Sequence, residues 1–266
     1  MDRMVQTALN SLKMMMENQT ATAHNLANVN TPGFRQDVAT DFSSIYLNRQ
    51  EGIEPRIVST RNTGGFSVEQ GQMENTGNSL DVAIQNDGYF IIQPKNGEIA
   101  LSRRGDLQSN ENGELIDGAG NQMLDAGLQP IIIPPFQSIN ISSDGQIRIK
   151  PLGGDVNAPP IEIAVLATVV PEAETKLKKS LDGHIRIEPI TNQAEDGTVT
   201  TEPVAIEANQ QAKIISEFLE KSNVNAVDEM VNSLEQQRKF EMHIKMIQMA
   251  EDLDNAGASL MRMPGN

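Results

Sequence analysis

The sequence predicts an α+β protein in which a mostly antiparallel β domain is flanked by long N- and C-terminal helices. Near both ends, apolar residues recur at intervals of three and four, whereas the long middle alternates apolar and polar residues between frequent turn signals. Methionine marks the same division, because five of the 13 lie in the first 16 residues and six lie between Met230 and Met263. Both apolar stripes are narrow and rich in adaptable methionine, so we expect the two helices to pair as a coiled-coil-like unit, with copies from neighbouring subunits as the alternative partners.

The first helix is predicted by an apolar spacing that runs from Val5 to Leu26, with no Pro or Gly before Pro32. Asn28 is suited to end this helix, because its side chain competes for backbone hydrogen bonds. Pro32 cannot continue the helix, and Gly33 permits a sharp exit of the chain.

The middle of the chain is predicted to be an all-β unit. Segments 80–84, 89–92 and 146–149 are strand-like, and Asn-Gly and Asp-Gly pairs supply tight turns between such segments. No convincing helix of ten or more residues occurs between Asn48 and Ala205.

The second helix is predicted from Asn225 to Met263, because apolar residues keep the helical spacing from Val227 to Leu253. Ser222, Asn223 and Asn225 are candidate caps for its first turn. The elements together predict four segments. Residues 1–34 form the first helix and the motif that ends it, and residues 35–78 form an extended connector. Residues 79–204 form a β-rich outer domain, and residues 205–266 contain a returning connector and the second helix.

Composition excludes several classes of function. The net charge of -15 repels phosphate backbones and anionic lipid headgroups, so we expect no binding to nucleic acid and no membrane insertion. The absence of cysteine excludes disulfides, thiolate nucleophiles and cysteine-based zinc sites. The N-terminal residues lack the continuous apolar region of a cleavable signal peptide.

The turn-rich centre does not contain a convincing catalytic or cofactor motif. The best calcium-loop frame begins at Gln108 and has Ala119 where a bidentate glutamate is required. Gly118-Ala119-Gly120 begins like a dinucleotide loop, but Met123 replaces its third glycine. We therefore expect no cofactor, no metal and no enzymatic activity.

Two segments resemble a known family. After the first helix, residues 25–35 read Asn-Leu-Ala-Asn, two further residues, then Thr-Pro-Gly-Phe-Arg. This string is similar to the signature of bacterial flagellar rod and hook proteins. Residues 219–231 and 237–242 independently resemble the C-terminal segment of that family, and residues 71–73, 80–85 and 142–147 resemble its β region. Within the family, the start of the chain and residues 254–257 are most similar to the proximal rod proteins, with the distal rod paralogue as the alternative.

The resemblance implies a structural subunit of the flagellar basal-body rod, in the part that spans the periplasm. Such a subunit would assemble with proximal and distal rod proteins and with copies of itself into a helical shaft that transmits motor torque. It would leave the cell through the flagellar type III export apparatus without a cleavable signal peptide. The competing interpretation is a secreted β-rich adhesin whose helices form an oligomerisation coil.

The residues that we expect to carry assembly lie in the two helical stripes and at their inner ends. Arg103, Arg104 and Arg186 are weaker candidates for ion pairs between subunits, because isolated surface pairs contribute only about 0–1 kcal/mol. The predicted assembly residues are Leu12, Met15, Met16, Asn25, Leu26, Ala27, Asn28, Thr31, Pro32, Gly33, Phe34, Ser222, Asn223, Val224, Val227, Met230, Val231, Leu234, Phe240, Ile244 and Ile247.

Overall fold

The chain divides into two compact units. A computed structural model describes residues 2–38, 43–46, 57–60, 65–153, 159–172, 175–180, 182–193, 199–202 and 204–261. The first unit, which we call the helical unit, contains Met1–Ala27, Asp37–Gly65 and Asn225–Asn266. The second, the β unit, contains Asn28–Gln36 and Phe66–Val224.

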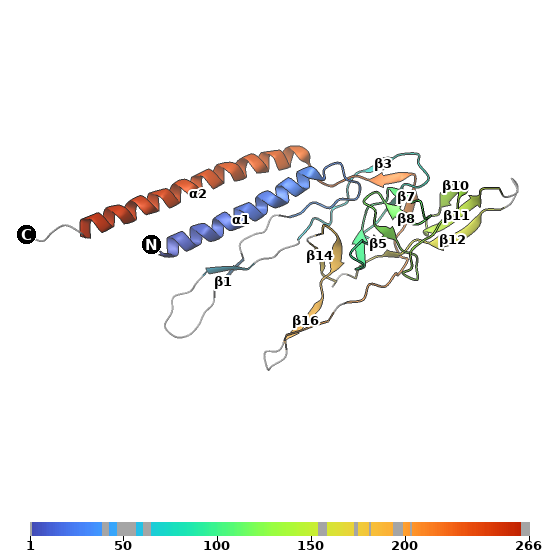
Figure 1. The fold of residues 1–266 in the computed structure, drawn as a ribbon, viewed down its shortest axis with the longest axis horizontal. Helices are drawn as coiled ribbons and strands as arrows, with labels where there is room; N and C mark the ends of the chain where they lie inside the picture. Colours follow the sequence, from blue (N-terminus) through green and yellow to red (C-terminus); the bar gives the residue numbers. More distant parts are fainter. Residues whose placement is uncertain are drawn as a thin grey trace, which may run out of the picture. The chain divides into compact units, whose positions relative to one another are not determined.

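The helical unit contains α1 (Asp2–Ala27) and α2 (Ala226–Met261), which lie side by side (Figure 1). Asn225 caps α2, because its Oδ1 accepts a hydrogen bond from the backbone N–H of Val227 at 3.0 Å. The same unit contains an antiparallel pair formed by β1 (Ser43–Tyr46) and β2 (Ile57–Thr60). Residues 262 and 263, which the sequence places in the second helix, lie outside the described residues.

The predicted fold class is wrong. The chain is mostly β, and the described residues contain two helices, α1 and α2, which do not form the expected coiled-coil-like unit. An apolar seam should bury the stripe of α2, but Val227, Val231 and Leu234 are 66%, 50% and 57% exposed.

The covered side of α2 includes Ile247 of the predicted stripe but is otherwise largely polar. Glu229, Gln236, His243 and Ala250 recur every seven positions, and each is buried or half-buried. Three of these four side chains are polar, whereas a coiled coil needs apolar residues at the positions that face its partner. The helical spacing predicts the helix correctly, but the expected pairing of the two stripes within the chain is wrong, because Val227, Val231 and Leu234 are exposed.

The β unit is made of short antiparallel strands, of which several are labelled in Figure 1. An eight-stranded sheet has the order β14-β15-β6-β5-β9-β8-β7, with β13 paired to β5, and a three-stranded sheet has the order β10-β11-β12. Three further pairs are β18 with β4, β19 with β3, and β16 with β17. The bounds are β3 (Met73–Asn75), β4 (Val82–Ile84), β5 (Tyr89–Gln93), β6 (Ala100–Ser102), β7 (Leu107–Ser109), β8 (Leu115–Asp117), β9 (Gln122–Met123), β10 (Phe136–Ile141), β11 (Gln146–Pro151), β12 (Ile161–Val165), β13 (Thr168–Val169), β14 (Leu177–Lys179), β15 (Ile185–Ile187), β16 (Ile190–Gln193), β17 (Val199–Glu202), β18 (Ile214–Ser216) and β19 (Phe218–Glu220).

Strand β5 separates two apolar clusters in the β unit. Phe90 and Ile92 pack in the larger cluster, whereas Tyr89 and Ile91 pack in the smaller one. Successive side chains of a strand point to opposite faces, so the continuous apolar run of β5 indicates a strand that is covered on both faces. This central strand gives the β unit a rigid core despite the low apolar content of the chain.

Two further observations concern the described part of the chain. No helix there combines the length and the apolar character needed to span a bilayer. The described residues also contain no group of three or more His, Asp or Glu side chains arranged to hold a metal ion.

Candidate functional site

The most densely connected polar site lies in the β unit, where residues from three parts of the sequence meet. We call it the junction, and it consists of Gly33, Phe34, Arg35, Arg103, Glu220 and Asn223. Residues 33–35 follow shortly after α1 along the chain, and residues 220–223 come shortly before α2. The junction therefore joins both helix-connecting segments to the β unit.

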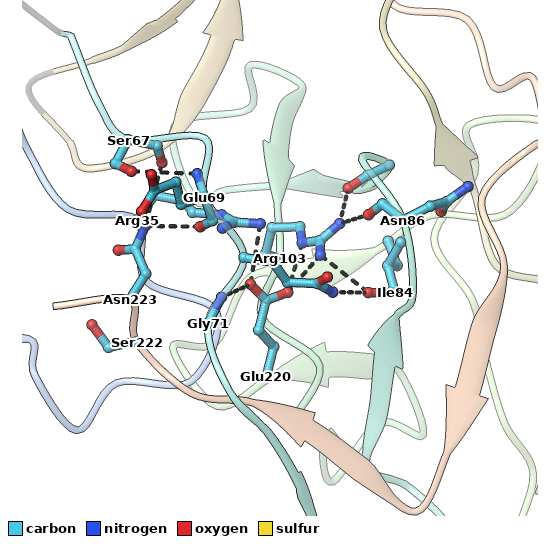
Figure 2. Close-up of polar contacts among 12 residues, drawn as sticks. Arg35, Ser67, Glu69, Gly71, Ile84, Asn86, Arg103, Glu220, Ser222 and Asn223 are labelled. Carbon is cyan, nitrogen blue, oxygen red and sulfur yellow. Dashed lines mark hydrogen bonds and ion pairs between the residues drawn. The ribbon is translucent and has the colours of Figure 1, made fainter.

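Glu220 is the centre of the junction, and its side chain is 1% exposed. Its Oε1 accepts from the backbone N–H of Gly71 at 3.0 Å and pairs with Arg35 Nη2 at 3.1 Å. Its Oε2 accepts from Nε and Nη2 of Arg103, each at 2.7 Å. Figure 2 shows the two guanidinium groups and the carboxylate meeting at one point. The donors and the two positive charges offset the cost of burying this carboxylate group.

Arg103 is held on the other side by backbone carbonyl groups. Its Nη1 donates to Asn86 O and, at 2.6 Å, to Gly88 O, and its Nη2 donates to Ile84 O at 3.0 Å (Figure 2). Burial lowers the pKa of Arg103, and the nearby Arg35 lowers it further, whereas Glu220 opposes both effects. The guanidinium is thus fixed to the strand ends of the β unit and is not available to another subunit.

The Thr-Pro-Gly-Phe motif fits into the junction through close backbone contacts. Gly33 has a φ of +67°, and a Cβ at this position would overlap the Arg103 carbonyl group. Its backbone N–H donates to Glu220 O at 2.7 Å. Lys179 Nζ lies 3.8 Å from the centre of the Phe34 ring and donates to Arg35 O at 2.9 Å.

Asn223 connects the C-terminal segment to two other segments of the β unit. Its Oδ1 accepts from the backbone N–H of Gln36 at 2.7 Å, and its Nδ2 donates to Glu69 O at 2.9 Å. Ser222 makes a local turn in which its Oγ accepts from the Val224 N–H at 3.3 Å. Asn225 is therefore the residue that caps α2, and Asn223 acts as a tether.

A second polar site lies within the helical unit. Asn25 is 1% exposed, its Nδ2 donates to Asp37 O at 3.0 Å, and its Oδ1 accepts from the Asp37 N–H at 2.7 Å. The same Nδ2 donates to Glu229 Oε1 at 2.9 Å. Further along, Gln236 Nε2 donates to Thr22 Oγ1 at 3.0 Å. Two direct side-chain hydrogen bonds therefore join α1 to α2.

The predicted assembly residues differ in their contacts and in their burial. Gly33, Phe34 and Asn223 belong to the junction, Asn25 belongs to the polar site of the helical unit, and Thr31 donates to Asn28 Oδ1 in the turn after α1. Leu12, Met15, Leu26, Asn28, Pro32 and Ile247 are half-buried, and Val224 is buried. Met16, Ala27, Val227, Met230, Val231, Leu234, Phe240 and Ile244 are exposed.

Sequence reasoning missed the charged members of the junction. Arg35 and Glu220 belong to motifs that the sequence identifies, but their ion pair is not predicted, because it joins segments that are far apart in the sequence. Arg103, which the sequence offered for an ion pair between subunits, has its partner inside the chain. Arg104 and Arg186 also have internal partners, Asp106 and Asp182, at 2.7 Å.

Comparisons with known proteins place these segments in a family. Residues 83–149 match the model described as "Flagellar hook protein FlgE/F/G D1 domain", and residues 215–260 match "Flagellar basal body rod FlgEFG protein C-terminal". The chain is 31% identical to flagellar basal-body rod protein FlgF of Escherichia coli (strain K12), over 97% of this chain and 96% of the relative. The chain belongs to the family of flagellar basal-body rod proteins.

Other relatives agree with this assignment. FlgF of Salmonella typhimurium (strain LT2) is 31% identical over 99% of this chain and 100% of the relative. FlgG of Buchnera aphidicola subsp. Schizaphis graminum is 30% identical over 89% of this chain and 91% of the relative. The predicted resemblance to the flagellar rod proteins, close to FlgF, is thus confirmed, and the chain is a structural rod subunit of the basal body. These comparisons do not support the adhesin alternative.

Proposed function

We propose that this chain is a non-enzymatic subunit of the proximal rod, and that it assembles through the exposed apolar side of α2. The residues of this side are Val227, Met230, Val231, Leu234, Met242, Met246, Met249 and Leu253. The observation that carries the proposal is their exposure, which ranges from 38% to 66% in a helix whose opposite side is covered. A rod subunit that covers this side on assembly gains roughly 25 cal/mol for each Å² of apolar surface removed from water.

The contacts are expected to be made with neighbouring rod subunits, including copies of this chain. A heterologous contact between different surfaces continues into a helical assembly, as a shaft that transmits torque requires. The exposed side of α2 suits several neighbours, because methionine is flexible and adapts to differently shaped surfaces. The half-buried residues of α1, such as Leu12 and Met15, are the second part of the proposed interface.

The junction is proposed to give the rod its stiffness within each subunit. It fixes the two segments that lead to the helices against one rigid β core, through Glu220 and Asn223. We also propose that the chain is exported through the flagellar type III apparatus without a cleavable signal peptide.

The distal rod is the second candidate position. It is supported by the FlgG relatives, of which the Buchnera protein is nearly as similar to this chain as the FlgF relatives are. The FlgF proteins of Escherichia coli and Salmonella typhimurium are 31% identical over 97% and 99% of this chain, against 30% over 89% for that FlgG relative, and we therefore favour the proximal position.

The absence of cysteine makes a direct test available. A single Leu234→Cys variant, labelled with a thiol-attached photocrosslinker in purified basal bodies, is expected to capture other rod-family subunits. A Glu111→Cys variant in an exposed turn of the β unit is the matched control and is expected to capture far less. Failure of the Leu234→Cys label to reach any rod subunit in complete basal bodies would contradict the proposed interface.

A further inference from the structure

The exposed apolar residues of α2 form two patches rather than one continuous stripe. Helical intervals of three and four relate the residues within each patch, so each patch forms a surface of its own. The first patch consists of residues that are 50% to 66% exposed, namely Val227, Met230, Val231 and Leu234. The second patch consists of residues that are 38% to 65% exposed, namely Met242, Met246, Met249 and Leu253.

The two patches lie on different sides of α2. Residues of the second patch follow residues of the first by 15 positions, as Met242 follows Val227 and Met249 follows Leu234. An α-helix rises about 1.5 Å and turns about 100° for each residue, so equivalent residues are about 22 Å apart along the axis and about 60° apart around it. A line drawn along the helix from the first patch therefore does not reach the second.

Charged side chains continue the line of the first patch. Arg238, Glu241 and Lys245 come after Leu234 at intervals of four, three and four, and all three are exposed. These intervals keep the three charges on the same side of α2 as the first patch. A neighbouring helix that followed this line would bury the charges, and burial of a charge without a partner is costly.

One neighbouring helix therefore does not cover both patches. A helix that packs nearly parallel to α2, as in a coiled coil, follows positions that repeat every seven residues and meets Val231, Arg238 and Lys245 in turn. A helix that crosses α2 at about 50°, the commonest angle of helix packing, moves away from its surface within a few turns. Either arrangement covers one patch and leaves the other exposed.

Other rod-family subunits carry segments that suit these patches. The match to the C-terminal model of the rod family covers residues 215–260 and so includes most of α2. The Escherichia coli relative aligns with this chain over 96% of its own length. Subunits of this family therefore have a segment that corresponds to α2 and can present an apolar helix to each patch.

We infer that α2 contacts two different neighbouring rod-family subunits, one through the first patch and one through the second. Arg238, Glu241 and Lys245 separate the two contacts, because neither neighbour gains by extending over them. The inference rests on the proposed function, since it divides the proposed interface of α2 between two subunits. The flexible methionines of the second patch suit a neighbour whose surface differs from the one that covers the first.

The test counts the subunits that one copy of α2 captures in assembled basal bodies. A photoreactive amino acid replaces both Leu234 and Met249 in one chain, and the cells also produce an excess of the unmodified chain. Irradiation is expected to give a product of three chains, because each position reaches a different subunit. The matched control carries the photoreactive amino acid at Met230 and Leu234, which lie in the same patch, and is expected to give products of two chains.

The outcomes separate this inference from the proposed function. Products of only two chains from the Leu234 and Met249 pair would overturn the inference but leave the proposed function intact, and so would capture at Leu234 without capture at Met249. A three-chain product from the control pair would also overturn it, because one patch would then contact two subunits. The absence of capture at all these positions would contradict both the inference and the proposed interface.

Discussion

Glu220 determines the local structure of the junction more than any other single side chain. Its carboxylate connects Arg35, Gly71 and Arg103, and its backbone carbonyl group accepts from the N–H of Gly33. A buried ion pair adds little stability compared with an apolar replacement of the whole cluster, but removal of one partner is costly because a buried charge is left without compensation.

We expect the Glu220→Gln variant to destabilise the β unit by about 3–5 kcal/mol, because two buried arginines lose their shared carboxylate. Urea unfolding followed by tyrosine fluorescence or circular dichroism measures the change. The control is Glu74→Gln, whose carboxylate pairs with Lys221 at a site where both side chains are 54% exposed, and where about 0–1 kcal/mol is expected. Equal effects of the two variants would show that Glu220 does not have the proposed role.

Gly33 is expected to be the least replaceable residue of the Thr-Pro-Gly-Phe motif. Gly33→Ala adds a Cβ that overlaps the Arg103 carbonyl group, in addition to the strain of a positive φ. The control is Gly97→Ala, which has a φ of +83° but open space around it, so that only the backbone strain of about 1–2 kcal/mol is added. The difference in unfolding free energy between the two variants measures the cost of the steric overlap at Gly33. If the Gly33→Ala variant is as stable as the Gly97→Ala variant, this overlap has no cost.

The sequence predicts local features of the junction but not its charges. The positive φ of Gly33 and the cap at Asn225 follow from residue types that act on their own backbone. The pairing of Arg103 with Glu220 joins residues 117 positions apart. Nothing in the neighbourhood of either residue indicates its partner, since solvent-exposed arginine and glutamate are common in any acidic chain.

The two helices show how a correct pattern leads to a wrong packing arrangement. Spacing of three and four identifies α1 and α2 correctly, because it reports the helical period. It does not indicate which side of a helix the protein itself covers. In α2, the covered positions carry Glu229, Gln236, His243, Ile247 and Ala250, whereas Val227, Val231 and Leu234 remain exposed.

The polar positions of α2 keep the contact between the helices weak. Gln236 Oε1 and His243 Nδ1 are buried and have no protein partner among the described residues. We expect His243→Leu to raise the free energy of unfolding of the helical unit by about 1 kcal/mol, because it removes an unpaired buried nitrogen. Lys245→Leu, at an exposed position of the same helix, is the control and should change stability by less than about 0.5 kcal/mol.

Hydrogen exchange of α2 is the suitable measurement, because local opening of one helix is not resolved by global unfolding. Slower exchange in the His243→Leu variant than in the wild type is the expected result. Faster exchange would mean that the histidine has a stabilising partner and that the polar contact is not weak.

The molecule as a whole combines a β unit that has its own apolar core with a helix, α2, on which Val227, Val231 and Leu234 are exposed. The β unit buries two apolar clusters around β5 and fixes both helix-connecting segments at the junction. The family assignment follows from motifs at both ends of the sequence, which the full-length relatives confirm. In a subunit of a larger assembly, the exposed methionine, valine and leucine side chains of α2 are suited to contact neighbouring subunits.

The decisive measurement is electron microscopy of basal bodies purified from cells that lack this gene and carry either the intact chain or a Val231→Glu, Leu234→Glu double variant. We expect the intact chain to restore complete rods, and the double variant to be folded and produced but to leave rods incomplete, because two charges on the exposed apolar side of α2 oppose its burial. Complete rods in cells without the chain would contradict its role as a rod subunit. Complete rods with the double variant would contradict the assignment of the interface to α2.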